Sequence, residues 1–298
     1  MKKPYETPQA IGPYTPMQLE EKISKLDVLD LRPYQDDLLK ELSGHEPQEL
    51  SFESLSERLR NYRLILLGDY HSYIPDQEIM FKIIKSLSGL KGIFVECMSS
   101  DQAKSVNRFM GGISFDKLLS VINWNYTWGF PVEVIKKVFE YARDNHIAII
   151  PMDAPDRNNK ILHERDDYMA HIIASTLAQD SGGVFVTFTT GLLHLAKNHL
   201  PNKILRSLKV LGKAPIPLAR VFSSQSILIE KSFDRHISPK TMQLDTDTFA
   251  VTASTTNSSG NEIFDPTATS ISYLQHVQKM GWDEEELYPS LYEILAET

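Results

Sequence analysis

The sequence predicts an α/β protein with a mostly parallel central sheet and helices on both of its faces. Two observations predict this class: short, continuously apolar runs typical of buried strands, and segments between them in which apolar residues recur at helical spacing. Such strand–helix alternation is typical of parallel sheets. A third observation concerns function, because polar residues directly follow several of the runs, at the sheet edge where ligand sites usually lie.

Four runs have the continuous apolar character of strands that are buried on both faces. In chain order they cover residues 63–67, 91–95, 146–152 and 184–190. A later run at residues 226–230 is expected to add one more strand and to close the alternating region.

Segments between these runs have the apolar spacing of helices that pack on a sheet. Two stripes carry this pattern, one formed by Ile79, Ile83, Ile84 and Leu87, the other by Val134, Val138 and Tyr141.

The two ends of the chain differ from the alternating region. Residues 1–16 contain four prolines and little apolar periodicity, which indicates an extended arm, and residues 17–59 have spacings typical of short helices. Residues 245–269 are rich in Thr, Ser, Asn and Asp and indicate a loop or an appended hairpin, and residues 271–295 predict a helix. We expect an N-terminal arm with short helices at 1–60, an α/β core at 61–232, and an appended loop or hairpin with a C-terminal helix at 233–298.

The composition narrows the possible partners and the compartment. A chain of 298 residues with 42% hydrophobic residues can bury a sizeable core, and its net charge of −8 disfavours general binders of nucleic acids or anionic membranes. No stretch approaches the ~20 apolar residues of a membrane span. Lys2 and Lys3 begin like a signal peptide, but no apolar core follows. Cys97 is the only cysteine, which excludes an internal disulfide, and we expect a cytoplasmic protein.

Two Gly-x-x-His elements each follow a predicted strand. They occupy residues 68–71 and 191–194, and they place His71 and His194 just beyond the strand ends. With 14 glycines and nine histidines, about 0.4 such elements are expected by chance, so two after strands are suggestive. We interpret each glycine as giving the chain the freedom to turn sharply off its strand.

The other two predicted strands end in carboxylates. Glu96 follows the run at 91–95, and Asp153 follows the run at 146–152. Because parallel strands end at a common edge, His71, Glu96, Asp153 and His194 could meet at one site. Simpler roles stay open: the histidines could be surface loop residues, Glu96 could form a salt bridge or help cap a helix, and Asp153 could order the turn before Pro155.

Cys97 lies next to Glu96, so a nucleophilic role has to be considered. Neighbouring side chains in a strand point to opposite faces, which would turn the thiol into the packing. We expect a buried, inert cysteine.

Two histidines and one or two carboxylates fit two chemistries. As ligands, His71, Glu96, Asp153 and His194 would hold Zn, Mn, Co or Fe(II) and leave a position for water, whose pKa the metal lowers. Without a metal, one histidine could serve as general base to a water held by the carboxylates.

Residues 62 to about 230 resemble the haem-binding uptake/Tiki superfamily, which groups ChaN-like haem-binding proteins, erythromycin esterases, TraB-like proteins and Tiki metalloproteases. The residues that carry the resemblance are 66–71, 94–98, 147–155 and 191–194, with Asp101, Gln102, Trp124, Trp128, Pro131, Ala142, Arg143, Arg165, Asp166, Met169 and Ala170. The stretch from Trp124 to Pro155 is most similar to the ChaN branch. The family usually has Glu in place of Asp69 and often Asn in place of Asp153.

The resemblance implies further site residues. Arg165 stands where the esterase branch holds a site arginine, which would stabilise an oxyanion; an ordinary exposed pair with Asp166 is the alternative. In the ChaN-like reading, Trp124, Tyr126 and Trp128 would line an apolar face for haem, with a tyrosine or histidine ligating the iron. The two tryptophans could instead form a core wedge.

From these patterns we expect a hydrolase that acts on an amide or ester of a small molecule or peptide. His71, Glu96, His194 and Arg165 would be its catalytic residues. The alternative is a haem- or metal-binding ChaN-like protein without catalysis, and a third class is an adaptor that has lost both properties.

Overall fold

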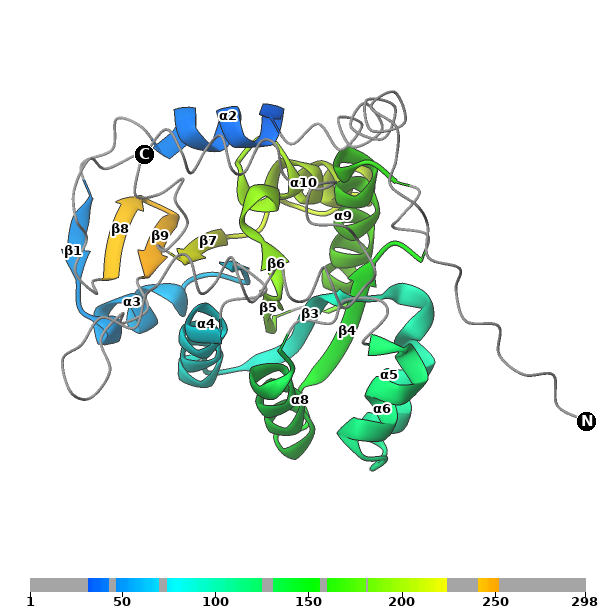
Figure 1. The fold of residues 1–298 in the computed structure, drawn as a ribbon. Coiled ribbons are helices and arrows are strands. Elements are labelled where there is room, and N and C mark those ends of the chain that lie inside the picture. Colours follow the sequence, from blue (N-terminus) through cyan, green and yellow to red (C-terminus); the bar gives the residue numbers. More distant parts are fainter. Residues whose placement is uncertain are drawn as a thin grey trace, which may run out of the picture.

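The structure is a computed structural model of the chain, and it describes residues 32–42, 47–69, 74–124, 131–155, 160–180, 182–223 and 241–251. Within these residues nine strands form one sheet with helices on both faces (Figure 1). The strand order is β1-β8-β9-β7-β2-β5-β3-β4, and the short β6 pairs with β2. Every pair from β9 to β4 is parallel, whereas β8 is antiparallel to both β1 and β9. The predicted fold class is confirmed.

The strands are β1 (Gln48–Leu50), β2 (Leu64–Asp69), β3 (Leu90–Ser99), β4 (Ala148–Asp153), β5 (Val184–Phe188), β6 (Thr190–Gly191), β7 (Leu218–Ser223), β8 (Thr241–Asp245) and β9 (Thr248–Val251). The helices are α2 (Arg32–Leu42), α3 (Phe52–Leu59), α4 (Ile74–Ser86), α5 (Ala103–Met110), α6 (Phe115–Ile122), α8 (Glu133–Asp144), α9 (Leu162–Gln179) and α10 (Leu200–Val210). Two short 3-10 helices, η2 (Ser100–Gln102) and η4 (Leu192–Leu195), follow the ends of strands.

The four apolar runs correspond to β2, β3, β4 and β5–β6, and the two helical stripes lie in or next to α4 and within α8. Strands β1 and β7 were not predicted from the sequence, and the strand expected at 226–230 lies outside the described residues. Short helices at 17–59 are represented by α2 and α3. The arm at 1–16 and the helix at 271–295 also lie outside the described part.

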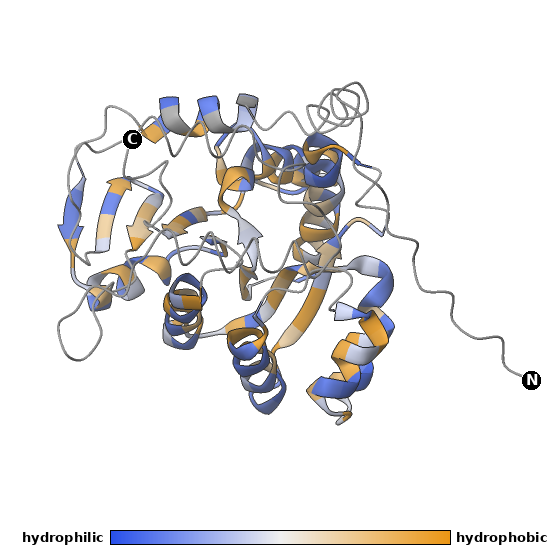
Figure 2. Cartoon of the chain, in the orientation of Figure 1, coloured by the Kyte–Doolittle hydropathy of each residue, from blue (hydrophilic) through white to orange (hydrophobic). Residues whose placement is uncertain are grey.

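Two apolar layers hold the helices on the sheet. One layer, the α8 face, lies between the sheet and α3, α4, α5, α6 and α8; the other, the α9 face, lies between the sheet and α2, α9 and α10. Side chains along β2 alternate between them, with Ile65 and Leu67 in the first and Leu64 and Leu66 in the second. Figure 2 shows the hydrophobic residues concentrated on the central strands.

The hairpin of β8 and β9 belongs to this sheet. Its β9 lies beside β7, and β8 pairs with β1 from the N-terminal segment. This hairpin at residues 241–251 overlaps the loop or hairpin expected at 245–269 only up to residue 251, and the rest of that stretch lies outside the described residues. No helix among the described residues has the length and apolarity required to cross a membrane.

Candidate functional site

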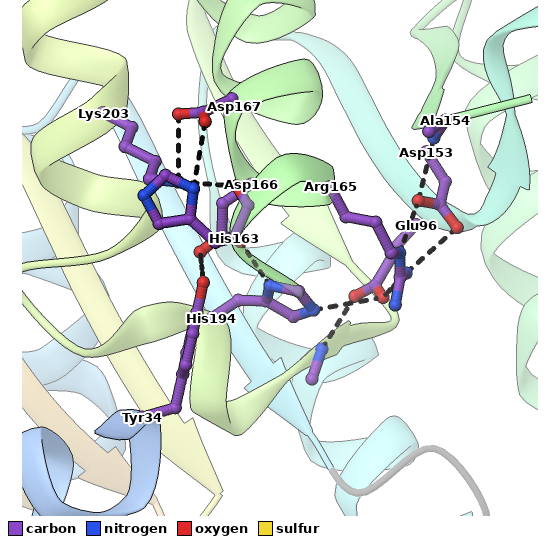
Figure 3. A network of polar contacts seen from close by, with 11 residues as sticks. Tyr34, Glu96, Asp153, Ala154, His163, Arg165, Asp166, Asp167, His194 and Lys203 are labelled. Atoms are coloured by element: carbon purple, nitrogen blue, oxygen red, sulfur yellow. Dashed lines mark hydrogen bonds and ion pairs between the residues drawn. The ribbon is translucent and has the colours of Figure 1, made fainter. Parts of the chain in front are cut away.

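A buried polar network lies on the α9 face, where β3 and β4 end (Figure 3). Its charged members come from four elements: Glu96 from β3, Asp153 from β4, Arg165 and Asp166 from the first turns of α9, and His194 from η4. The predicted meeting of Glu96, Asp153 and His194 at one edge therefore occurs, and Arg165 joins them. His71 lies outside the described residues, so its position stays a prediction.

Glu96 is the centre of the network. Along β3, Cys97 faces the α8 layer and Phe94 faces the α9 layer, and Glu96 continues the side of Phe94. Its Oε1 accepts a hydrogen bond from Arg165 Nη2 at 2.5 Å and lies 3.3 Å from His194 Nε2, while Oε2 accepts from the backbone N–H of Gly191 at 3.0 Å. The structure thus agrees with the salt-bridge alternative for Glu96, which contacts Arg165, His194 and a backbone N–H.

Arg165 connects Glu96 to Asp153. Its Nε and Nη2 each donate to one oxygen of Asp153 at 3.0 Å, the two-pronged geometry that suits guanidinium and carboxylate groups. Asp153 Oδ1 also accepts from the N–H of Ala154 at 2.8 Å, so this carboxylate orders its turn as well. Arg165 and Asp166 are thus not an ordinary exposed pair, because the Arg165 side chain is only 13% exposed and that of Asp166 is 0% exposed.

His194 lies between two carboxylates. Its Nδ1 is hydrogen-bonded to Asp166 Oδ1, and its Nε2 faces Glu96 Oε1. Carboxylate oxygens at both nitrogens favour a proton on each nitrogen, and therefore the imidazolium form of the ring. Burial by itself lowers the pKa of His194, but the charges and hydrogen bonds of Glu96 and Asp166 outweigh burial and raise the pKa to about 10.

The other ionisable groups respond to the same neighbours. Burial raises the pKa of Asp153 above its usual value, and the charge of Arg165 opposes that effect. Burial lowers the pKa of Arg165, but Glu96 and Asp153 outweigh burial and raise it, so this guanidinium stays charged. On the opposite face, burial raises the pKa of the Cys97 thiol to about 12. Cys97 is therefore the buried, inert thiol that the sequence predicts.

Asp166 and Tyr34 were not predicted as site residues. Asp166 is part of the Arg165-Asp166 motif, and its position one residue after a site arginine was the only signal in the sequence. Tyr34 lies in α2, and its hydroxyl donates to Asp166 Oδ2 at 2.7 Å. No pattern points to Tyr34, because α2 reaches this site only through tertiary packing.

Backbone geometry brings η4 to the network. Thr189 interrupts the strand between β5 and β6 with a φ of 54°, a region that a β-branched residue rarely adopts. Its Oγ1 accepts from the N–H of Cys97 at 3.2 Å and donates to the carbonyl of Phe188 at 2.6 Å, which fixes this turn. Two residues later, Gly191 donates to Glu96.

The role predicted for the two motif glycines is wrong. Neither Gly68 nor Gly191 adopts a positive φ, so neither supplies a turn that other residues avoid. Gly68 is required for close approach instead: a Cβ there would lie 2.7 Å from Leu195 Cδ2 and 3.4 Å from the backbone Cα of Leu192. The absence of a side chain lets η4 pack directly on β2.

The described residues do not fit a divalent metal in this arrangement. Among the residues that the structure describes, no group of three or more His, Cys, Asp and Glu side chains is arranged to hold a metal ion. Both nitrogens of His194 face carboxylates, and the oxygens of Glu96 and Asp153 receive hydrogen bonds from Arg165 and from backbone N–H groups. The predicted metal set of His71, Glu96, Asp153 and His194 therefore lacks available donors in its three described members.

The described residues do not supply a haem site either. Trp124 is 3% exposed and packs in the α8 layer, which agrees with the core-wedge alternative. Tyr126 and Trp128 lie outside the described residues. His194, with both nitrogens engaged, has none left for iron in this arrangement.

Comparisons with known proteins bear on the predicted resemblance. No curated protein matches the chain. Among solved structures, ChaN of Campylobacter jejuni, described with cofacial haem binding, has 14% identity and a TM-score of 0.48, over 61% of this chain and 90% of that one.

Two toxin structures are also similar, each over less than half of its own length. RRSP, a MARTX toxin effector domain from Vibrio vulnificus, has 19% identity and a TM-score of 0.36, over 72% of this chain and 40% of that one. The C-terminal region of Pasteurella multocida toxin, described with a thiol-protease-like catalytic triad, has 19% identity and a TM-score of 0.35, over 47% and 20% of the two chains.

The matched family bears the same description as the predicted one. Residues 55–164, which include β2, β3, β4 and the first turn of α9, match the family model described as haem-binding uptake, Tiki superfamily, ChaN. The resemblance to the haem-binding uptake/Tiki superfamily that the strand-end motifs predict is thus confirmed over this region of the chain.

Proposed function

We propose that the protein is a hydrolase that cleaves an ester or amide bond of a small molecule or peptide. One arrangement carries the proposal: His194 lies between the carboxylates of Asp166 and Glu96, which favour its charged form, and Arg165 adjoins the same Glu96 oxygen. Two buried cations at the end of a sheet are suited to a reaction in which negative charge develops on oxygen.

The proposal assigns a chemical role to His194, Arg165 and His71. Water adds to the carbonyl carbon of the substrate while a base accepts the proton of the water. As the bond breaks, the leaving oxygen or nitrogen takes the place of Glu96 Oε1 at His194 Nε2 and accepts the Nε2 proton. Arg165 stabilises the oxyanion; its side chain, 13% exposed, is the most accessible of the network. Because His194 already carries two protons, the base in this proposal is His71.

A metal-free reaction suits these donors better than a metal-assisted one. Each described ligand candidate is already engaged with Arg165, with a backbone N–H or with another member of the network. Binding a metal would require His194 to lose a proton that two carboxylates stabilise.

The test uses purified protein with phenethyl acetate as ester probe, because its alkoxide leaving group needs a proton, and fluorescein-labelled casein as peptide probe. His194→Gln and His71→Ala should each reduce the turnover of the cleaved probe by about 10²-fold or more, a typical contribution of general acid–base catalysis. His171→Gln is the matched control, since His171 is exposed on α9, and it should keep wild-type turnover. Equal rates for wild type and His194→Gln, or no cleavage of either probe by wild type, would contradict the proposal.

A second candidate, haem binding, is favoured by the family match at residues 55–164. In this alternative Trp124, Tyr126 and Trp128 would line the apolar face, and a tyrosine or histidine would ligate iron. Titration with haem should then give a saturable Soret shift that Tyr126→Phe weakens. Absence of saturable binding would remove this candidate.

A further inference from the structure

We propose that Tyr34, in helix α2, is a positioning residue that holds Asp166 and, through it, orients His194. The inference rests on the proposed function, in which His194 is the proton donor. It extends that function to a helix outside residues 55–164, the region that matches the family.

The hydrogen bonds carry the argument. The Tyr34 hydroxyl donates to Asp166 Oδ2 at 2.7 Å, and the other oxygen, Oδ1, binds His194 Nδ1 (Figure 3). A carboxylate held at both oxygens has a fixed plane, so the direction of its bond to the imidazole is fixed as well. That direction places His194 Nε2 at 3.3 Å from Glu96.

Packing holds the Tyr34 ring independently of its hydroxyl. The ring stacks on His199 with centroids 3.6 Å apart and planes 18° apart, and it meets the edge of His194 at 6.5 Å and 80°. Tyr34 is 4% exposed. Burial raises the pKa of Tyr34, and the charge of Asp166 raises it further, so the phenol stays neutral and donates. Replacement by phenylalanine therefore removes one hydrogen bond and preserves the ring contacts.

The other end of α2 contacts the segment that follows η4. Glu41 pairs with the buried Arg220 and accepts from the N–H of Lys197 at 2.8 Å, and Arg220 donates to the carbonyl of Leu195 at 3.1 Å. Helix α2 is thus attached near both of its ends. Glu41 attaches α2 to the rest of the fold, whereas Tyr34 orients Asp166 and His194. Substituting each residue alone separates these two effects.

The experiment compares Tyr34→Phe with Tyr62→Phe and Glu41→Gln. Tyr62 is the matched control, because its hydroxyl also donates one hydrogen bond, at 2.7 Å, to the carbonyl of Thr246 in the turn between β8 and β9. The readout is the low-field proton NMR resonance of His194 Nδ1–H, assigned by its loss in His194→Gln. Where a probe is cleaved, kcat and KM are measured as well.

Tyr34→Phe should shift the His194 resonance and lower kcat by about tenfold or more at unchanged KM, the scale of one hydrogen bond to a charged group. Tyr62→Phe should change neither quantity. Glu41→Gln should lower the melting temperature and leave the resonance in place. An unshifted resonance in Tyr34→Phe, or the same shift in Glu41→Gln, would overturn the positioning role. Because the resonance is observed without substrate, failure of the hydrolase proposal would leave this test intact.

Discussion

At the scale of single residues, the site depends on which groups surround the imidazole of His194. Burial alone would keep His194 neutral, yet two carboxylates face its nitrogens and keep it charged. The protein thereby gains a buried cation whose protonation changes the stability of the fold.

The raised pKa of His194 predicts that the free energy of unfolding falls as the pH rises from about 6.5 to about 10. In that interval His194 has lost its second proton in the unfolded chain and retains it in the folded protein. Each further increase in pH therefore lowers the free energy of unfolding. The stabilisation of the fold by protonated His194 is complete below about 6.5, the pKa of histidine in the unfolded chain, and is lost above about 10, its pKa in the folded protein. Thermal melts across this range provide the measurement.

His194→Gln serves as the reference for this prediction, because every other titratable group is the same in both proteins. The difference in unfolding free energy between wild type and variant should shrink as the pH rises, at up to about 1.4 kcal/mol per unit. His171→Gln should retain the wild-type slope. A constant difference between wild type and His194→Gln would contradict the imidazolium assignment.

At the scale of elements, the contact between β2 and η4 positions His194. Gly68 in β2 leaves the space that Leu192 and Leu195 of η4 occupy. Both leucines are buried, so they have little room to yield to an added methyl group.

Gly68→Ala is therefore expected to destabilise the protein by about 1–3 kcal/mol, the usual cost of overpacking, and to displace η4 together with His194. Gly182→Ala is the matched control, because a Cβ at Gly182 would meet no atom within 4 Å. Denaturant unfolding measures the first effect, and the His194 proton resonance reports the second. Equal stability of the two alanine variants would show that η4 does not pack on β2 as closely as described.

At the scale of the whole molecule, segments from both ends of the sequence complete the sheet. The edge beyond β7 is formed by β9, β8 and β1, so residues before 61 and after 232 pair with each other. Phe249 of β9 is fully buried in the α8 layer. Arg220 of β7 is buried against Thr248 of β9 and Glu41 of α2.

We predict that a fragment of residues 61–232, the α/β core expected from the sequence, does not fold by itself. It would lose β1, β8, β9, α2 and α3, and it would leave the charge of Arg220 without its carboxylate partners. Circular dichroism should detect no cooperative thermal transition in the fragment, whereas the full chain should melt cooperatively. A cooperative melt of the fragment would instead show that the flanking segments are not required for the core to fold.

The sequence alone predicted the fold class, four strands of the sheet, and the meeting of Glu96, Asp153 and His194 at one edge. These features were accessible because apolar runs and their ends are local, and because parallel strands place their carboxyl ends together. The sequence also predicted Arg165 as a site residue and Cys97 as a buried thiol, and it offered a core position as the alternative for Trp124. The role of Gly68 was misjudged, because a glycine that permits a turn and one that permits close packing have the same sequence signature.

Tertiary structure alone decided how these groups are paired. Arg165 bridges two carboxylates, and Asp166 and Glu96 lie on either side of His194. Tyr34 contacts Asp166 although 132 residues separate them in the sequence. These pairings depend on contacts between elements that are distant in the chain. Charge state follows from such contacts, because a pKa is set by burial and by neighbouring charges in space. The sequence thus determined which groups reach the sheet edge, and packing determined that the histidine among them lies between two carboxylates.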